Sequence, residues 1–317
     1  MTEPVVTKEG QEVLDRFLNI RPPIIREEQK AKYLRILSLL MTEQGAKEAG
    51  RDLVSEAIKM VEPKALHPIF HSWEEPEKLK KFSERYRDIE AYYAGPCEVK
   101  RWEHPSISKP AKRPEEMKVI AFCASPRKGG NTDALIDEAL RGVRDAGAQG
   151  EKFMLQKMNI KTCISCRKCL DPAYERICAI KDDVSEIIFP KLIDSDAIII
   201  GFPIYIGREC ARLTMLLERW GALGEFLREK MILKPGRRAM VIGTWGYPYV
   251  DTYDHVTAEI IMRLHVSGVE TVEAISACGF VGMLRGLDDK RRGLILRFPK
   301  ELEKAYQAGK SLVTGES

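Results

Sequence analysis

The sequence has no long hydrophobic run and no large excess of one charge. Its most apolar stretch, Ala197 to Ile206, is far shorter than the roughly 20 apolar residues that cross a bilayer, and it contains Gly201 and Pro203. The 51 basic and 47 acidic residues leave a net charge of +4, and no basic cluster is interleaved with aromatic residues. The sequence therefore favours neither a membrane-spanning nor a nucleic-acid-binding protein.

Export signals and several catalytic signatures are also missing. The first four residues, Met1 to Pro4, open neither the basic nor the apolar segment of a signal peptide, so we expect a cytoplasmic protein. The P-loop motif of nucleoside triphosphatases, G-x-x-x-x-G-K-[ST], is absent, as is a separate G-x-G-x-x-G nicotinamide fingerprint. Without an export signal, clustered cysteines indicate metal ligands rather than disulfides.

Four of the eight cysteines lie between residues 163 and 178, a segment that we call the cysteine loop. Cys163, Cys166, Cys169 and Cys178 have the spacing C-x2-C-x2-C-x8-C, which suits the ligands of a cuboidal iron–sulfur cluster. Structural zinc sites usually use two separated C-x2-C pairs, so zinc is less favoured. Metal-free redox thiols are the third interpretation. The many charged residues of this loop exclude a buried strand or helix face.

Composition and periodicity divide the chain into three parts. Residues 1–93 are predicted to be helical, because apolar residues recur at three- and four-residue steps in residues 26–41, 46–62 and 76–93. We expect these apolar stripes to pack within the protein or its oligomer. Residues 94–116 contain four prolines and many charges, which predicts an extended linker.

The third part, residues 117–317, alternates between strand and helix patterns. The predicted strands are residues 119–124, 150–155, 196–201, 238–243 and 269–277. Such alternation predicts an α/β domain with an open, doubly wound parallel sheet and helices on both faces. Five strands fit the flavodoxin-like order 2-1-3-4-5, in which ligands bind beyond the carboxyl ends of the strands.

The loop after the first predicted strand, residues 123–132, has the chemistry of a phosphate site, and we call it the phosphate loop. It leads into the N-terminus of a helix, where backbone N–H groups and a partial positive charge favour anions. Its candidate phosphate ligands are Ser125, Arg127, Gly129, Gly130, Asn131 and Thr132.

Two further loops at the same edge suit a planar ring. The loop after the third predicted strand offers flat or apolar groups, and the loop after the fourth adds aromatic residues. The candidate ring contacts are Pro203, Ile204, Tyr205, Ile206, Thr244, Trp245, Gly246 and Tyr247. Phosphate donors and a ring-sized slot together predict a site for flavin mononucleotide (FMN). Cys210 begins the next helix, where a thiol with a lowered pKa could face the flavin.

The cysteine loop follows the second predicted strand, so it emerges at the same edge as the flavin loops. We therefore expect the cluster and the flavin to be near neighbours, within one subunit or across a dimer. A one-electron cluster beside a flavin is an electron-transfer pair.

Four stretches together resemble the iron–sulfur flavoprotein family, a branch of the flavodoxin-like NAD(P)H-dependent FMN reductases. They are S-P-R-K-G-G-N-T (125–132), the cysteine loop, C-A-I-K-D-D (178–183) and G-F-P-I-Y-I-G with L-L-E-R-W (201–220). The resemblance implies FMN on the first, third and fourth loops and a [4Fe-4S] cluster on the cysteines. It also implies homodimers or dimers of dimers, with ferredoxin as electron donor. The x8 spacing before Cys178 and the N-terminal helical region depart from the family pattern.

Three functions follow from these patterns. The first is an FMN- and [4Fe-4S]-dependent oxidoreductase that passes electrons from a ferredoxin-like donor to a small acceptor or a partner protein. The second is an NAD(P)H-dependent FMN or quinone reductase without a cluster. The third is a non-catalytic electron carrier or redox sensor.

Overall fold

The structure is a computed structural model that describes residues 4–62, 97–103, 109–171, 173–224, 232–233, 236–246, 250–279 and 293–316. The chain divides into two compact units, residues 1–88 and 89–317. Within the described residues, no helix has both the length and the apolar character needed to cross a membrane.

The described part of the first unit consists of the helices α1 (Lys8–Asn19), α2 (Pro23–Gln44) and α3 (Arg51–Val61). The hydroxyl of Thr7 caps α1 by accepting the Gly10 amide at 3.2 Å. Gly45 ends α2 with a left-handed φ of 64°, which glycine adopts at little cost. The predicted apolar stripes of residues 26–41 and 46–62 line the core of this unit. The third stripe, residues 76–93, lies outside the described residues.

A buried carboxylate ties the three helices together. Glu62 follows α3, and its side chain accepts hydrogen bonds from Arg21, from the Tyr33 hydroxyl and, at 2.8 Å, from Gln29. Burial, aided by the neighbouring Glu62, raises the pKa of Tyr33 to about 12. These partners supply the hydrogen bonds and the positive charge that a buried carboxylate needs.

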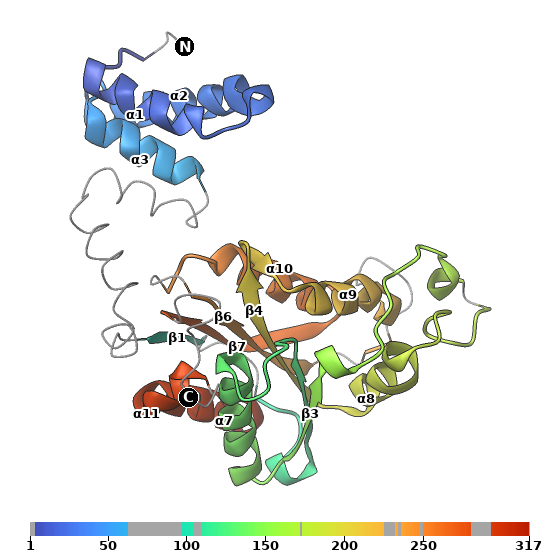
Figure 1. Cartoon of the computed structure of the whole chain (residues 1–317). Helices are drawn as coiled ribbons and strands as arrows, with labels where there is room; N and C mark the ends of the chain where they lie inside the picture. Colours follow the sequence, from blue (N-terminus) through green and yellow to red (C-terminus); the bar gives the residue numbers. More distant parts are fainter. Residues whose placement is uncertain are drawn as a thin grey trace. The chain divides into compact units, whose positions relative to one another are not determined.

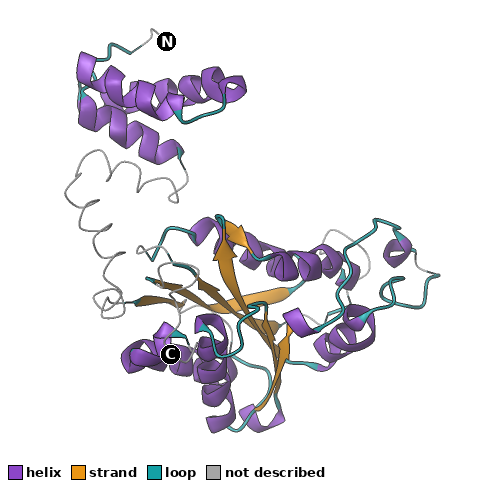
Figure 2. Cartoon of the chain, in the orientation of Figure 1, coloured by secondary structure: helices purple, strands orange, loops and turns teal. Residues whose placement is uncertain are grey.

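The second unit contains a mostly parallel sheet (Figure 2). Its strands are β1 (Glu98–Glu103), β2 (Lys118–Cys123), β3 (Gln149–Met154), β4 (Ala197–Tyr205), β5 (Arg208–Glu209), β6 (Arg237–Thr244) and β7 (Val269–Cys278). Their order is β1-β7-β6-β4-β2-β3, and β5 pairs only with β4. Numbered among themselves along the chain, the parallel strands β2, β3, β4, β6 and β7 lie in the order 2-1-3-4-5. The prediction of an α/β fold is confirmed.

The sheet has two strands more than predicted, and one of them lies in the segment predicted as a linker. Within residues 94–116, β1 pairs antiparallel with β7, with Glu98 opposite Cys278. The Arg101 and Glu273 side chains form an ion pair across these strands at 2.7 Å. The Val99 amide also donates to the Glu301 carboxylate at 2.8 Å. Because β7 would otherwise be an unpaired edge, the chain before the parallel strands is used to cover it.

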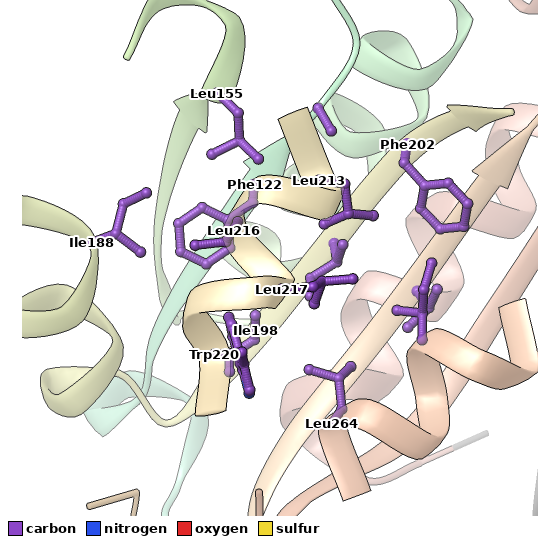
Figure 3. Packing of buried hydrophobic residues seen from close by; sticks show 14 of the residues in the cluster. Phe122, Leu155, Ile188, Ile198, Phe202, Leu213, Leu216, Leu217, Trp220 and Leu264 are labelled. Atoms are coloured by element: carbon purple, nitrogen blue, oxygen red, sulfur yellow. The ribbon is translucent and has the colours of Figure 1, made fainter. Parts of the chain in front are cut away.

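Helices cover both faces of the sheet (Figure 1). On one face lie α7 (Asn131–Asp145) and α11 (Pro299–Thr314), and on the other α8 (Phe189–Asp194), α9 (Ala211–Trp220) and α10 (Asp254–His265). The first pair packs closely, since a Cβ added at Gly309 would lie 1.9 Å from the Ala139 carbonyl oxygen. On the opposite face, α9 buries Leu213, Leu216 and Trp220 against the sheet (Figure 3).

Candidate functional site

The phosphate loop is a formed turn between β2 and α7. The Ala124 amide donates to the Gly201 carbonyl at 2.8 Å, which holds the loop against β4. Ser125 is buried and its hydroxyl accepts the Arg127 amide at 3.2 Å. Gly129 has a φ of 73°, a left-handed conformation that favours glycine. The predicted phosphate ligands Ser125 to Thr132 therefore lie on one turn at the N-terminus of a 15-residue helix, α7.

Part of the hydrogen-bonding capacity of this loop is already used within the protein. The Gly129 amide donates to the Asp133 carboxylate at 2.7 Å, and Asp133 also pairs with Lys152 Nζ at 2.7 Å. The Asn131 side-chain oxygen accepts the Ile295 amide at 3.0 Å. The Gly293 amide donates to the Gly129 carbonyl at 2.6 Å. An acidic residue and a segment near residue 295 thus hold the loop in shape.

The sequence patterns predicted neither of these supports. Asp133 could have been found, since it lies three residues after Gly130, where an acidic side chain in a first helical turn is stabilised. Gly293 and Ile295 carry no such signal, because they are separated from the loop by more than 160 residues.

The loops after β2, β4 and β6 meet at the carboxyl edge of the sheet. The hydroxyls of Thr132 and Thr244 share a buried hydrogen bond of 2.6 Å. Pro203 is the register partner of Thr244, so the third and fourth predicted loops begin side by side. The structure therefore brings together residues from all three predicted flavin loops.

The β4 loop is a tight hairpin. Ile206 and Gly207 have φ values of 50° and 78° and form the turn, after which Arg208 pairs with Tyr205. Two positive φ values in a two-residue hairpin are typical of a type I′ turn, but a β-branched residue is strained there. Ile206 is 96% exposed and Tyr205 is 36% exposed, whereas Ile204 is buried. Only the tip of this predicted ring slot thus presents accessible side chains.

Trp245 faces the core. It is 4% exposed, its amide donates to the Ala277 carbonyl at 3.0 Å, and its ring meets Tyr253 edge-on with centroids 5.6 Å apart. Gly246 follows in the same loop and is half-buried. Tyr247, the last predicted ring contact, lies outside the described residues.

Cys210, considered as a thiol that could face the flavin, is instead part of the core. Its thiol is buried and donates to the Ala124 carbonyl at 3.3 Å, so it serves as a contact between the start of α9 and the phosphate loop. Burial raises the pKa of Cys210, although helix N-terminal amides act in the opposite direction. Desolvation outweighs the helix terminus here because the side chain lies inside the core.

The cysteine loop projects from the body of the domain between β3 and α8 (Figure 1). Cys163 and Cys166 are exposed, Cys169 is half-buried and Cys178 is buried. Ser165 and Arg167, which lie between the first three cysteines, have φ values of 51° and 58°. Among the described residues, no three His, Cys, Asp or Glu side chains are grouped so that they could hold a metal ion. The four predicted ligands are therefore not gathered in this conformation.

The two ends of the cysteine loop are joined by a buried ion pair. Asp182 accepts the Lys161 amide at 2.9 Å and pairs with Arg219 at 2.8 Å. Arg219 also donates to the Lys161 carbonyl at 3.1 Å. The Asp182 and Arg219 side chains are 0% and 1% exposed. The polar sequence of the loop gave no sign of this pair, although both residues belong to stretches that carry the family resemblance.

The charges of this pair are stabilised by their surroundings. Burial acts to raise the pKa of Asp182, but hydrogen bonds from Arg219 and the backbone outweigh it, and the pKa is lowered. Burial acts to lower the pKa of Arg219, but its interactions with Asp182 and Cys178 outweigh burial, and the pKa is raised. Both groups therefore remain charged.

Helix α9 connects the two candidate sites. Its N-cap, Cys210, contacts the phosphate loop, and its last turn carries Arg219 and Glu218, whose carboxylate accepts the Cys163 amide at 3.3 Å. Nine residues separate Cys210 from Arg219, which corresponds to about 13 Å along a helix. The base of the cysteine loop thus lies about one short helix away from the phosphate loop.

Comparison with known proteins adds a family to this geometry. Residues 117–248 match the family model described as NADPH-dependent FMN reductase. An iron–sulfur flavoprotein of Methanocaldococcus jannaschii is 41% identical over 103 residues, which cover 32% of this chain and 51% of that protein. An iron–sulfur flavoprotein of Methanosarcina thermophila is 32% identical over 103 residues, which cover 32% of this chain and 52% of that protein. The chain spans about half the length of these curated relatives.

Solved structures similar to this chain include an NAD(P)H:quinone oxidoreductase from Methanothermobacter marburgensis, with a TM-score of 0.47 and 20% identity. That alignment covers 62% of this chain and 96% of the other.

Proposed function

Residues 117–248 form a domain of the NADPH-dependent FMN reductase family, and from this premise we propose that the protein is a flavin-dependent oxidoreductase of the iron–sulfur flavoprotein type. FMN would bind at the carboxyl edge of the sheet, and a [4Fe-4S] cluster would bind on the cysteine loop. When bound, these groups would supply one-electron transfer at the cluster and one- or two-electron transfer at the flavin.

The observation that carries the flavin proposal is the meeting of three loops at one sheet edge. The Thr132–Thr244 hydrogen bond joins the loops after β2 and β6, and the N-terminus of α7 supplies a positive end for the phosphate. Asp133 orders the turn from beneath and holds Gly129 in its left-handed conformation. We expect these residues to bind and orient the flavin phosphate.

The donor set of the cysteine loop fits an iron–sulfur cluster in its chemistry. Cys163, Cys166, Cys169 and Cys178 form no disulfides and lie on one loop whose two ends are fixed to each other. The buried Arg219 Nε has no hydrogen-bond partner among the described residues, and Cys178 contributes to the raised pKa of this guanidinium. A negatively charged ligand set here would therefore meet an uncompensated buried donor.

We propose a ferredoxin-like electron donor and a homodimer, or a dimer of dimers, as partners. Two exposed apolar side chains on the cysteine loop, Ile164 and Leu170, support docking by another protein at this point. A second subunit could also bring another flavin closer to the cluster than the length of α9 allows within one chain. The electrons would go to a small acceptor or a partner protein.

The proposal is tested by measuring iron, sulfide, zinc and FMN per subunit in protein purified without oxygen. We expect one FMN and about four irons, with cluster absorbance beneath the flavin bands. One FMN without iron would remove the cluster from the proposal. Absence of FMN would overturn the proposal as a whole.

A cluster-free NAD(P)H-dependent FMN or quinone reductase is the second candidate. It is supported by the match of residues 117–248 to a family model described as NADPH-dependent FMN reductase. Rapid anaerobic bleaching of the flavin by NADPH, in protein that lacks iron, would support this function over the first.

A further inference from the structure

A buried acid is part of the proposed phosphate site. Asp133 lies in the first turn of α7, its side chain is 3% exposed, and its Oδ2 accepts the Gly129 amide at 2.7 Å. This bond holds the loop in shape, but the carboxylate also brings a negative charge to a loop that is expected to hold a phosphate. Like charges repel strongly where little water screens them. A phosphate site of this kind therefore needs a cation that neutralises Asp133.

Lys152 supplies this cation from the neighbouring strand. It lies on β3, on the same face as Gly150, where an added Cβ would be 3.0 Å from the Leu140 side chain of α7 (Figure 1). From this face the lysine Nζ reaches Asp133 Oδ1 at 2.7 Å and Asp137 at 2.5 Å. The two acids are four residues apart, so they are neighbours on the helix surface. One lysine thus joins the first turns of α7 to β3.

The two acids do not need the lysine equally. The Asp137 side chain is 56% exposed, so water screens its charge, whereas that of Asp133 is almost fully buried. Burial acts to lower the pKa of Lys152, but hydrogen bonds to Asp133 and Asp137 outweigh burial, and the pKa is raised. The lysine therefore stays charged, and its charge acts mainly on the buried acid of the phosphate site.

We propose that Lys152 is a positioning residue of the phosphate loop and sets the preference of the site for a flavin that carries a 5′-phosphate. By neutralising Asp133, the lysine lets this carboxylate hold the Gly129 amide without repelling the phosphate of FMN. The inference rests on the FMN binding of the proposed function and is independent of the cysteine loop. It predicts that binding of riboflavin, which has the same ring but no phosphate, does not depend on Lys152.

The test titrates flavin-free, full-length protein with FMN and with riboflavin and compares the two dissociation constants. Lys152→Met leaves Asp133 without its cation. Lys152→Met with Asp133→Asn removes both charges and keeps a side-chain oxygen for the Gly129 amide. Lys152→Arg keeps the positive charge. Lys191→Met is the matched control, since it breaks a second ion pair of β3, between Lys191 and Glu151 at 2.7 Å.

In Lys152→Met we expect the dissociation constant of FMN to rise about tenfold, the scale set by one uncompensated charge several ångströms away, with little change for riboflavin. Lys152→Arg, the double variant and Lys191→Met should keep the wild-type preference for FMN. A merely structural tie between β3 and α7 would instead weaken the binding of both flavins alike. The ratio of the two dissociation constants therefore separates the two roles.

Two results in the variants would overturn the inference and leave the proposed function intact. They are an unchanged FMN preference in Lys152→Met and an equal loss of preference in the single and double variants. If Lys152→Met does not fold, Lys152→Gln takes its place, because glutamine can donate to Asp133 without a charge. A reduced FMN preference in Lys152→Gln would support the inference, and an unchanged one would overturn it.

The wild type separates this inference from the proposed function. A wild type that binds FMN no better than riboflavin would overturn the inference and leave a flavoprotein. A wild type that binds neither flavin would overturn the proposed function together with the inference.

Discussion

The phosphate loop and the cysteine loop both follow strands of the same parallel sheet, but they differ in how far the polypeptide alone has formed them. The phosphate loop is closed by its own hydrogen bonds, from Gly129 to Asp133 and from Ile295 to Asn131. The cysteine loop is anchored at its base, and its four thiols are spread from the surface to the core. Backbone donors can be arranged by folding alone, whereas thiolates repel one another and need a metal to gather them.

The largest effect should come from removal of one cysteine ligand. In Cys166→Ala we expect iron to fall from about four per subunit towards none, with FMN unchanged, because only the cysteine loop depends on the cluster. Iron analysis and the absorption spectrum measure this. Ser165→Ala, next to the same cysteine, should keep its iron. Unchanged iron in Cys166→Ala would show that Cys166 is not a cluster ligand.

The Asp182–Arg219 ion pair at the base of the cysteine loop can be removed separately. Arg219→Met leaves Asp182 charged and buried without its partner, which should lower the free energy of unfolding by about 3–5 kcal/mol. Urea unfolding of the cluster-free protein measures this. The double variant with Asp182→Asn should regain most of the loss, and equal stability of the single and double variants would argue against the ion pair.

The phosphate loop can be loosened at its contact with β6. Thr132→Val leaves the buried Thr244 hydroxyl without its 2.6 Å partner, which should cost about 1–3 kcal/mol. Urea unfolding and FMN titration would both report the change. Replacing both threonines by valine should be closer to neutral for stability, and a larger loss in that double variant would contradict this account.

Acidic pH should reduce the stability that the Asp182–Arg219 pair gives to the base of the cysteine loop. The pKa of Asp182 in the folded protein lies below its ordinary value of 3.8, so its contribution to stability is present above that pH and is lost as the pH falls through the lowered folded pKa. Stability measured as a function of pH should therefore decline less steeply below pH 3.8 in the variant without both charges. Parallel curves for the two proteins would rule out this source of acid sensitivity.

The smallest effect concerns the hairpin tip beside the phosphate loop. Ile206 has a φ of 50°, and a side chain in this region costs about 1–2 kcal/mol. Ile206→Asn should stabilise the domain by about 1 kcal/mol, since asparagine tolerates the conformation. Thermal unfolding measures this. If FMN affinity falls at the same time, the exposed isoleucine contributes to binding, as predicted for the ring slot.

Much of the sheet was predictable because its strands are short apolar runs between turn residues, as in residues 196–201 before Pro203. The phosphate loop was predictable for a similar reason, since Gly129 and Asn131 mark a turn into a helix. Apart from Asp133, the supports of both loops were not predictable, because they join residues far apart in sequence. Asp182 and Arg219 are 37 residues apart, and Asn131 and Ile295 are 164 apart. Only the fold makes them neighbours.

Strand β1 has a consequence for where the flavin domain can be cut. The family match begins at residue 117, yet the backbone of β7 is paired with residues 98–103. A shortened protein that starts at Met117 would expose the N–H and C=O groups of β7 along a bare edge, which is a template for self-association and aggregation. Residues outside the family match thus cover the edge of the sheet. The segment that the flavin domain needs for folding therefore begins before Glu98, not at residue 117, where the family match begins.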